Sequence, residues 1–237
     1  MQVVSQIKAK YIAILGPTAA TFCILLCYGI AIYQGHVKPW LPMISWCYEI
    51  APGSYISRFF MISSAVLLNI NSVLVLSLLN SRAMFGGARV TDRYAYYMVT
   101  LGCIGLGMVG SISDKENNPV HSAAALVFFI TFQAYNILVA ARLWPTSVPY
   151  ASKMIKTVSA AYGTIALAVF IYVSIARVPN FMLYSAFCEW TGTIAILAFN
   201  VSFVYEFGDD FVIDAIYNDK KDTDLEDSKK NTVVYDL

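Results

Sequence analysis

Six long apolar stretches constrain this chain more than any other feature of its sequence. An α-helix rises about 1.5 Å per residue, so about 20 apolar residues cross the roughly 30 Å hydrocarbon core of a membrane. Backbone amides in lipid must be paired within the segment, and the stretches lack the period of two that barrel strands have, so we predict helices. The predicted spans are 11–33, 56–79, 94–113, 121–143, 154–175 and 182–205.

The composition agrees with a membrane protein. Hydrophobic residues make up 58 % of the 237 residues and charged residues only 13 %, whereas a soluble domain carries roughly 25 % charged residues. The five cysteines show no metal-site spacing, and no disulfide framework is expected. The sequence predicts an all-α integral membrane protein, with a six-transmembrane-helix bundle over residues 1–207 and no metal or other cofactor.

Lysine and arginine residues in the short connections predict the orientation of the bundle, because they collect on the cytosolic side of a membrane. One set of connections, taken with the C-terminal tail, contains twelve of these residues, and the other set contains four. Both termini are therefore predicted to be cytosolic. Connections 34–55, 114–120 and 176–181 are predicted to face a lumen or the outside.

The C-terminal segment 208–237 differs in composition from the rest of the chain. From Glu206 onward there are ten acidic residues against four lysines. Such a segment cannot bury enough apolar surface to fold, so we predict a disordered cytosolic tail and expect truncation after Phe207 to leave the bundle folded. Its end, from Tyr235 to Leu237, weakly matches the peptides that add as a strand to a PDZ groove, which suggests a cytosolic protein partner.

Ionisable side chains inside a membrane are costly and mark candidate functional sites. Arg58, His121 and Glu189 belong to the second, fourth and sixth predicted spans, each near the outer surface. One interpretation is a structural salt bridge with hydrogen bonds that holds these helices together. The other is a lumen-facing polar site: a pH sensor, a lipid-headgroup pocket or part of a transport pathway. A histidine beside a carboxylate suits a pH sensor, because the unperturbed histidine pKa is about 6.5.

Small residues in the third span predict close helix packing. Cys103, Gly107 and Ser111 are spaced four apart, a small-xxx-small pattern that lets a neighbouring helix approach closely. The neighbour is expected to be a helix of the same chain, with a dimer interface as the alternative. The sequence does not fix the oligomeric state.

Motifs of enzyme active sites are missing from the sequence. It contains two histidines and no HExxH, H-x-E or carboxylate pair suited to a metal. It also contains no GxSxG nucleophile elbow and no Walker loop. The chain is therefore predicted not to be an enzyme. Membrane lipids are its expected surroundings, and no nucleic-acid partner is expected.

Three short motifs, in a fixed order along the chain, resemble a known family. The first outer connection reads GHVKPWLPMIS, His121 opens a later helix, and the sixth span contains CEW and closes with FVYEF. The pattern resembles the family of DRAM (damage-regulated autophagy modulator), Sfk-type and GPI-remodelling FRAG-type membrane proteins, and within it the DRAM branch. The motif positions are Gly35, His36, Pro39, Pro42, Ile44, Ser45, Pro52, Trp190, Phe203, Glu206 and Phe207.

The resemblance implies a non-enzymatic regulator of autophagy, endomembrane trafficking or phosphoinositide signalling. It implies a lysosomal or endosomal membrane, with the plasma membrane or Golgi as alternatives. A transporter, channel or lipid scramblase built on the polar cluster is one alternative function, and a GPI-anchor remodelling factor is another. Members of the DRAM branch continue the first loop with an acidic-Thr-Gly stretch and Pro-Pro-Glu. Here Glu49 precedes the single Pro52, so whatever that loop recognises is expected to differ.

Overall fold

Six long helices form the body of the protein. The structure is a computed structural model that describes residues 2–81, 89–176 and 178–217. Within these ranges six helices are long and apolar enough to cross a membrane, which confirms the predicted class and number of spans. The helices are α1 (Ala9–Tyr33), α2 (Gly53–Ser81), α3 (Val90–Ser111), α4 (Asp114–Leu143), α5 (Tyr150–Ala176) and α6 (Phe181–Val201).

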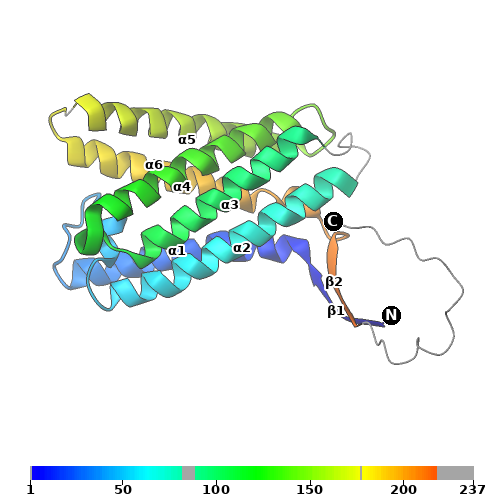
Figure 1. Ribbon diagram of the computed structural model, residues 1–237, viewed down its shortest axis with the longest axis horizontal. Helices are drawn as coiled ribbons and strands as arrows, with labels where there is room; N and C mark the ends of the chain where they lie inside the picture. The colour runs from blue at the N-terminus through cyan, green and yellow to red at the C-terminus, as the bar shows by residue number, and fades with distance from the viewer. Residues whose placement is uncertain (1, 82–88, 177, 218–237) are drawn as a thin grey trace, which may run out of the picture.

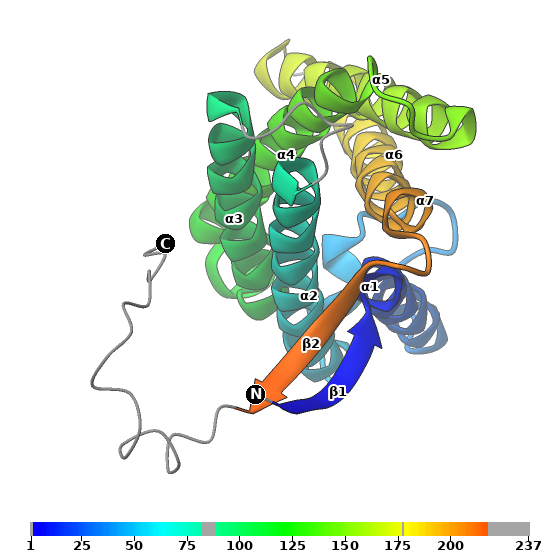
Figure 2. The same ribbon diagram turned by 90° about the vertical axis from the view of Figure 1, so that its right-hand side faces the viewer.

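The helices run up and down, so alternate connections lie at opposite ends of the bundle (Figure 1). The α1–α2, α3–α4 and α5–α6 connections share one end, which we call the outer end. The α4–α5 connection and both described termini share the other, which we call the inner end. Viewed from that end, α5 lies at the margin of the bundle and packs against α4 and α6 (Figure 2). The cytosolic orientation of the inner end stays a prediction.

The largest difference from the predicted spans is the start of α4. It begins at Asp114 rather than at 121, because the Ser113 and Glu116 side chains form a capping box that starts a helical turn in polar sequence. The backbone then leaves helical geometry at Asn117 (φ −159°, ψ 86°), just before Pro119. A proline inside a helix removes one hydrogen bond and crowds the preceding turn, so the capped turn is set off from the rest of the helix by a kink.

Four short elements complete the fold. The 3₁₀ helix η1 (Ser45–Tyr48) lies in the loop between α1 and α2, and α7 (Val204–Phe207) extends α6 at the inner end. Strands β1 (Gln2–Lys8) and β2 (Val212–Tyr217) pair antiparallel and project from the bundle (Figure 1).

The strand pair changes the interpretation of the tail. Residues 208–217 belong to the segment predicted to be disordered, yet the structure folds them back along the N-terminal segment, with Lys8 opposite Val212. Hydrophobicity and charge did not indicate this pairing, because it depends on two segments some 200 residues apart meeting at one end of the bundle. Residues 218–237, including the PDZ-like end at Tyr235 and Leu237, lie outside the described residues, and the predictions for them stay predictions.

The small residues of α3 pack differently from the prediction. Cys103 is buried, but a Cβ added at Gly107 would meet nothing within 4 Å, and the Ser111 hydroxyl donates to the carbonyl of Gly107 within the same helix. The close approaches occur instead at other glycines of the helix. A Cβ at Gly102 would lie 2.5 Å from the Phe132 ring, and one at Gly105 would lie 2.9 Å from the Ala124 carbonyl. The predicted ridge of Cys103, Gly107 and Ser111 is therefore corrected: α4 packs on the face that carries Gly102 and Gly105.

Aromatic rings run through the core from α4 to the inner end. Successive ring centroids are 5.2 to 6.5 Å apart, in mostly edge-to-face contacts that aromatic quadrupoles favour. The rings belong to Phe128, Phe132, Tyr135, Phe199, Phe203 and Phe207. The motif residues Phe203 and Phe207 are fully buried and so position α7 against the core.

Candidate functional site

The loop between α1 and α2 is held on α6 by the carboxylate of Glu189. The backbone N–H of Ile44 donates to Glu189 Oε2 at 2.8 Å, and that of Ser45 donates to Oε1 at 3.3 Å. These amides lie at the start of η1, where a helical turn offers them no earlier carbonyl. A carboxylate satisfies both donors and suits the positive end of the turn. Glu189 is therefore bonded to the protein's own backbone.

The neighbouring Trp190 fixes the proline-rich half of the same loop. Its indole Nε1–H donates to the carbonyl of Pro42 at 2.8 Å. Tyr28 of α1 packs edge-on against the Trp190 ring, with centroids 5.9 Å apart, and its hydroxyl donates to the carbonyl of Pro39 at 2.6 Å. Helices α1 and α6 thus both bond to the same loop.

The two longest motifs of the resemblance are therefore halves of one structure. The GHVKPWLPMIS motif lies in the loop, and the CEW motif lies on α6 and bonds to it. Ile44 and Ser45 are both buried against the bundle. We call loop 34–52 together with Tyr28, Glu189 and Trp190 the outer-loop unit. No sequence signal pointed to Tyr28, because one tyrosine in an apolar span looks like any lipid-facing aromatic residue.

Gly35 and His36 of the motif end α1. The N–H of Gly35 donates to the carbonyl of Ile32 at 2.9 Å, and the N–H of His36 donates to that of Ala31 at 2.8 Å. This pair of bonds is the Schellman motif, which needs a left-handed residue after the helix. Gly35 has φ +67°, a conformation that costs glycine little. The Gly-His sequence is therefore explained in part as a helix end.

The His36 side chain faces a carboxylate of the same loop. Its Nε2 lies 3.5 Å from Glu49 Oε2, and 18 % and 14 % of the two side chains are exposed. Burial raises the pKa of Glu49 above its ordinary value of 4.5, and His36 partly offsets the rise. Asp114 raises this pKa further, whereas Lys115 and His121 lower it. Both histidines of the chain thus act on one carboxyl group at the outer end.

The predicted cluster of Arg58, His121 and Glu189 does not form. All three lie toward the outer end, but among the described residues no hydrogen bond or ion pair joins any two of them. Arg58 pairs with Glu116, which belongs to the capping box of α4. His121 Nδ1 lies 2.6 Å from the carbonyl of Ile112, the residue that ends α3, so His121 ties these two helices together. Polar groups in a membrane pair with other side chains or with backbone groups, and each of these three side chains does so with a different partner.

A second polar site, at the inner end, joins α5 to α7. Lys156 Nζ lies 3.0 Å and 3.1 Å from the two carboxylate oxygens of Glu206, and both side chains are buried. It also donates to the hydroxyls of Ser152 at 2.8 Å and Ser202 at 2.7 Å, and lies 4.2 Å from the centroid of the Phe203 ring. All three ammonium protons thus have partners. Glu206, a position of the resemblance, neutralises a charge in the bundle.

The importance of Lys156 was missed, although a signal existed. The residue lies inside the predicted span 154–175, where an ionisable group indicates a buried partner. The twelve lysines and arginines assigned to the cytosolic connections and tail include Lys156 and also Arg142, whose Nε lies 3.2 Å from Asp92 Oδ1 with 4 % of each side chain exposed. Two cations of the inner end therefore neutralise buried acids, and they do not add to the loop charge on which the predicted orientation rests.

The contacts of the outer-loop unit fix the position of the loop. Among the residues that the structure describes, no three His, Cys, Asp or Glu side chains lie together as metal ligands would. Glu189 and Trp190 hold backbone groups, and His36 and Glu49 form the titratable pair of the loop. The unit therefore holds the loop on α1 and α6, and the loop contains one carboxyl group, that of Glu49, whose pKa burial raises.

Comparisons with known proteins agree along most of the chain. The family model described as Frag1/DRAM/Sfk1/Cwh43P N-terminal domain matches residues 8–210. DNA damage-regulated autophagy modulator protein 1 of Mus musculus is 24 % identical over 225 residues, which cover 80 % of this chain and 87 % of that protein. The Xenopus laevis protein of the same name is 25 % identical over 201 residues (77 % and 84 %), and the Homo sapiens protein is 23 % identical over 207 residues (80 % and 87 %). No solved structure matches the chain.

The family match confirms the resemblance inferred from the motifs. It begins at the last residue of β1, ends just beyond α7, and so includes all six spans and the outer-loop unit. The chain is a multi-pass membrane protein and belongs to the Frag1/DRAM/Sfk1 family.

Proposed function

We propose that this protein is a non-enzymatic, DRAM-like regulator that modulates autophagy from an endosomal or lysosomal membrane. The observation that carries the proposal is how much of the chain is similar to these relatives. Relatives named as autophagy modulators match about four fifths of the chain, and the match includes the whole bundle. The name of these relatives describes regulation and implies no chemical reaction.

The polar groups of the bundle support a regulator over a transporter. Buried charges that serve a pathway must be able to release their partners as a substrate passes. Here the Lys156 ammonium makes bonds to two serines and a carboxylate, and Glu189 is bonded to two backbone amides. Such groups hold helices and loops in place.

The position of the His36–Glu49 pair supports an acidic compartment on the outer side. We propose that the inner end, with both termini, faces the cytosol, and that loop 34–52 faces the lumen. Burial favours the protonated form of Glu49, so an acidic lumen relieves the cost of burying that carboxylate. A lysosomal or endosomal lumen supplies such acidity.

The experiment is complementation of cells that lack the protein. We would reintroduce wild type, Trp190→Phe, or Tyr184→Phe, an aromatic change on an exposed residue of α6 outside the outer-loop unit. The readouts are the compartment of a tagged copy and the turnover of the lipidated autophagosome marker, with and without inhibition of lysosomal proteases. We expect slow turnover without the protein, recovery with wild type and Tyr184→Phe, and incomplete recovery with Trp190→Phe at equal abundance and location.

Normal marker turnover in cells without the protein, both fed and starved, would contradict the proposal. Purified protein in liposomes, followed at pH 5 and pH 7, provides the opposing test. Ion flux or lipid scrambling above empty liposomes would indicate the transport alternative instead. A Golgi location with altered GPI-anchored proteins would indicate a remodelling factor.

A further inference from the structure

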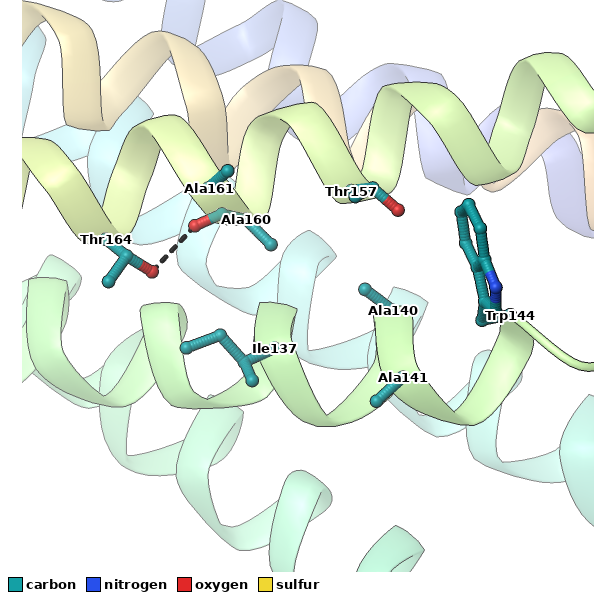
Figure 3. Close-up of a pocket in the computed structure, with 8 residues that line it drawn as sticks. All are labelled: Ile137, Ala140, Ala141, Trp144, Thr157, Ala160, Ala161 and Thr164. Carbon is teal, nitrogen blue, oxygen red and sulfur yellow. Dashed lines mark hydrogen bonds between the residues drawn. The ribbon is translucent and has the colours of Figure 1, made fainter.

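A groove between α4 and α5 opens toward the lipid near the inner end. Its volume is about 340 Å³, within the range of about 300–1,000 Å³ that small-molecule sites occupy. The groove is open because four of its lining residues are alanines, whose side chains are too small to fill it: Ala140 and Ala141 on α4, and Ala160 and Ala161 on α5. Figure 3 shows these residues along the two facing helices.

The occupant of the groove must come from the membrane. The groove lies on the surface of two spans, and it is continuous with their exposed side chains, such as Ile137 and Ile165. The hydrocarbon core contains no water to fill an apolar recess, and an empty recess forfeits dispersion contacts along its lining. A lipid component that fits between the helices is therefore stabilised there relative to bulk lipid.

The groove has a polar hydroxyl group near one end. The Thr157 hydroxyl turns into the gap between the helices, near the indole of Trp144 (Figure 3). Hydroxyls in apolar helices normally donate to the carbonyl four residues earlier. Seven in these spans do so: Thr21, Ser63, Ser111, Thr131, Thr164, Ser174 and Thr191. Among the described residues Thr157, like Ser64 and Ser185, has no hydrogen-bond partner, and of these three it is the one that lines the groove.

We propose that the α4–α5 groove binds a membrane sterol, whose hydroxyl pairs with Thr157 beside Trp144 and whose fused rings lie on the alanines. Alanine methyls form a low, even wall, and a rigid flat ring system contacts such a wall without losing conformational entropy. A flexible acyl chain must first be straightened, which lowers its affinity for the same groove. A sterol carries a single hydroxyl, which matches the single free hydroxyl of the groove.

The depth of the polar end agrees with this occupant. Trp144 follows the last residue of α4, and tryptophan belongs to the membrane–water boundary. Thr157 lies on the second turn of α5, about 10 Å from its start by the helical rise. The hydroxyl of a sterol occupies this level, just beneath the headgroups. Val148, Tyr150 and Lys153 also follow a spacing proposed for sterol contact, which by itself is weak support.

Photocrosslinking of the purified full-length protein tests the proposal. The protein would be placed in phosphatidylcholine nanodiscs with a trace of a photoreactive, clickable sterol, and the labelled peptides identified by mass spectrometry. We expect label on α4 and α5 around the groove. Excess unlabelled sterol should remove it, and the same excess of added phosphatidylcholine should not.

Matched variants locate the contact. Ala140→Leu fills the groove and should reduce its labelling at least about fivefold, whereas Ala123→Leu, an exposed position on the same helix, should not. Thr157→Val keeps the shape and should weaken competition by unlabelled sterol about fivefold, the effect of one hydrogen bond. Thr191→Val, whose hydroxyl already has an internal partner, should behave as wild type.

Label spread evenly over all lipid-facing helices would overturn the proposal. Equal labelling of Ala140→Leu and Ala123→Leu would overturn it as well, and so would equal competition by sterol and phosphatidylcholine. Crosslinks through the groove to a second copy, with no sterol label there, would assign the face to self-association instead. Because Thr157→Val changes no volume, its result stands even if Ala140→Leu disturbs helix packing.

Discussion

The two ends of the bundle are held together by different chemistry. At the outer end, Glu189 and Trp190 bond to backbone groups of a loop. At the inner end, Lys156 and Glu206 bring opposite charges together in a dry environment. Bonds to backbone fix the shape of one segment, whereas a buried ion pair fixes one helix against another. The inner end is therefore expected to tolerate substitution least, because a lone buried charge costs more than a lost hydrogen bond.

The largest effect is expected from Lys156→Met. This change leaves the Glu206 carboxylate buried without its cation, and breaking such a pair costs about 3–5 kcal/mol. The thermal unfolding midpoint of the purified protein in nanodiscs should fall strongly, and α7 should become accessible to protease.

The double variant Lys156→Met with Glu206→Gln is the control. It removes both charges, so most of the lost stability should return, since a buried pair often contributes little relative to neutral residues of similar shape. Additive losses in the double variant would show that the pair is not what joins the two helices.

A smaller effect is expected from Glu189→Gln. The neutral amide keeps the shape but weakens the bonds to the Ile44 and Ser45 amides, a difference of about 1–2 kcal/mol between charged and neutral acceptors. Hydrogen exchange at residues 43–48 should accelerate, while exchange in the spans stays unchanged. The comparison between the two ends would fail if this variant unfolded the bundle as much as Lys156→Met did.

Glu116→Gln serves as the matched change at the same end. Glu116 is half exposed and lies in the first turn of α4, so its substitution should leave the exchange of the first loop as in wild type.

Protonation of Glu49 should stabilise the loop at the outer end and leave the inner end unchanged. Burial holds the folded pKa of Glu49 above 4.5, so the folded loop binds this proton more tightly than the unfolded loop. The resulting stability is complete below pH 4.5 and is lost as pH rises through the raised pKa. After correction for intrinsic rates, exchange in loop 34–52 should be slower at pH 5 than at pH 7. In Glu49→Gln this gain in protection at pH 5 should be lost.

The sequence predicted the bundle well because one strong physical rule governs it. Length and apolarity alone decide whether a segment can span lipid, so six spans emerged within a few residues of their observed bounds. The capped first turn of α4 was missed, because Ser113 and Glu116 start a helix through side-chain bonds that hydropathy ignores. Local chemistry of this kind is visible in the sequence as S-x-x-E.

The candidate site was predicted only in part. Depth along each helix placed Arg58, His121 and Glu189 at one level, but which neighbour each would meet depends on helix rotation and on loops. The partner of Glu189 is backbone, which no pattern of side chains can indicate. The motif positions of the loop and of α6 came from the resemblance as separate motifs, and only the folded chain shows that the loop bonds to Glu189 and Trp190.

The smallest effect is expected at the strand pair of β1 and β2, which joins the two ends of the described chain. Asp209 accepts from Lys8 and Lys10 at 2.6 Å each, and these bonds lower its pKa to about 2. The carboxylate is exposed, so solvent and salt screen its interactions, and it is neither a buried pair nor a backbone anchor. Its contribution is present above pH 3.8 and is lost only as pH falls toward 2.

Asp209→Asn should therefore speed amide exchange in β1 and β2 modestly, more at low salt than at high salt, with no change in the thermal midpoint of the bundle. The neighbouring Asp210→Asn makes the same chemical change without these bonds and should leave strand exchange as in wild type. Truncation after Phe207 removes Asp209 and β2 together and should still leave six protected spans. A large loss of thermal stability in that truncation would show that the strand pair, and not the Lys156–Glu206 bond, holds the inner end closed.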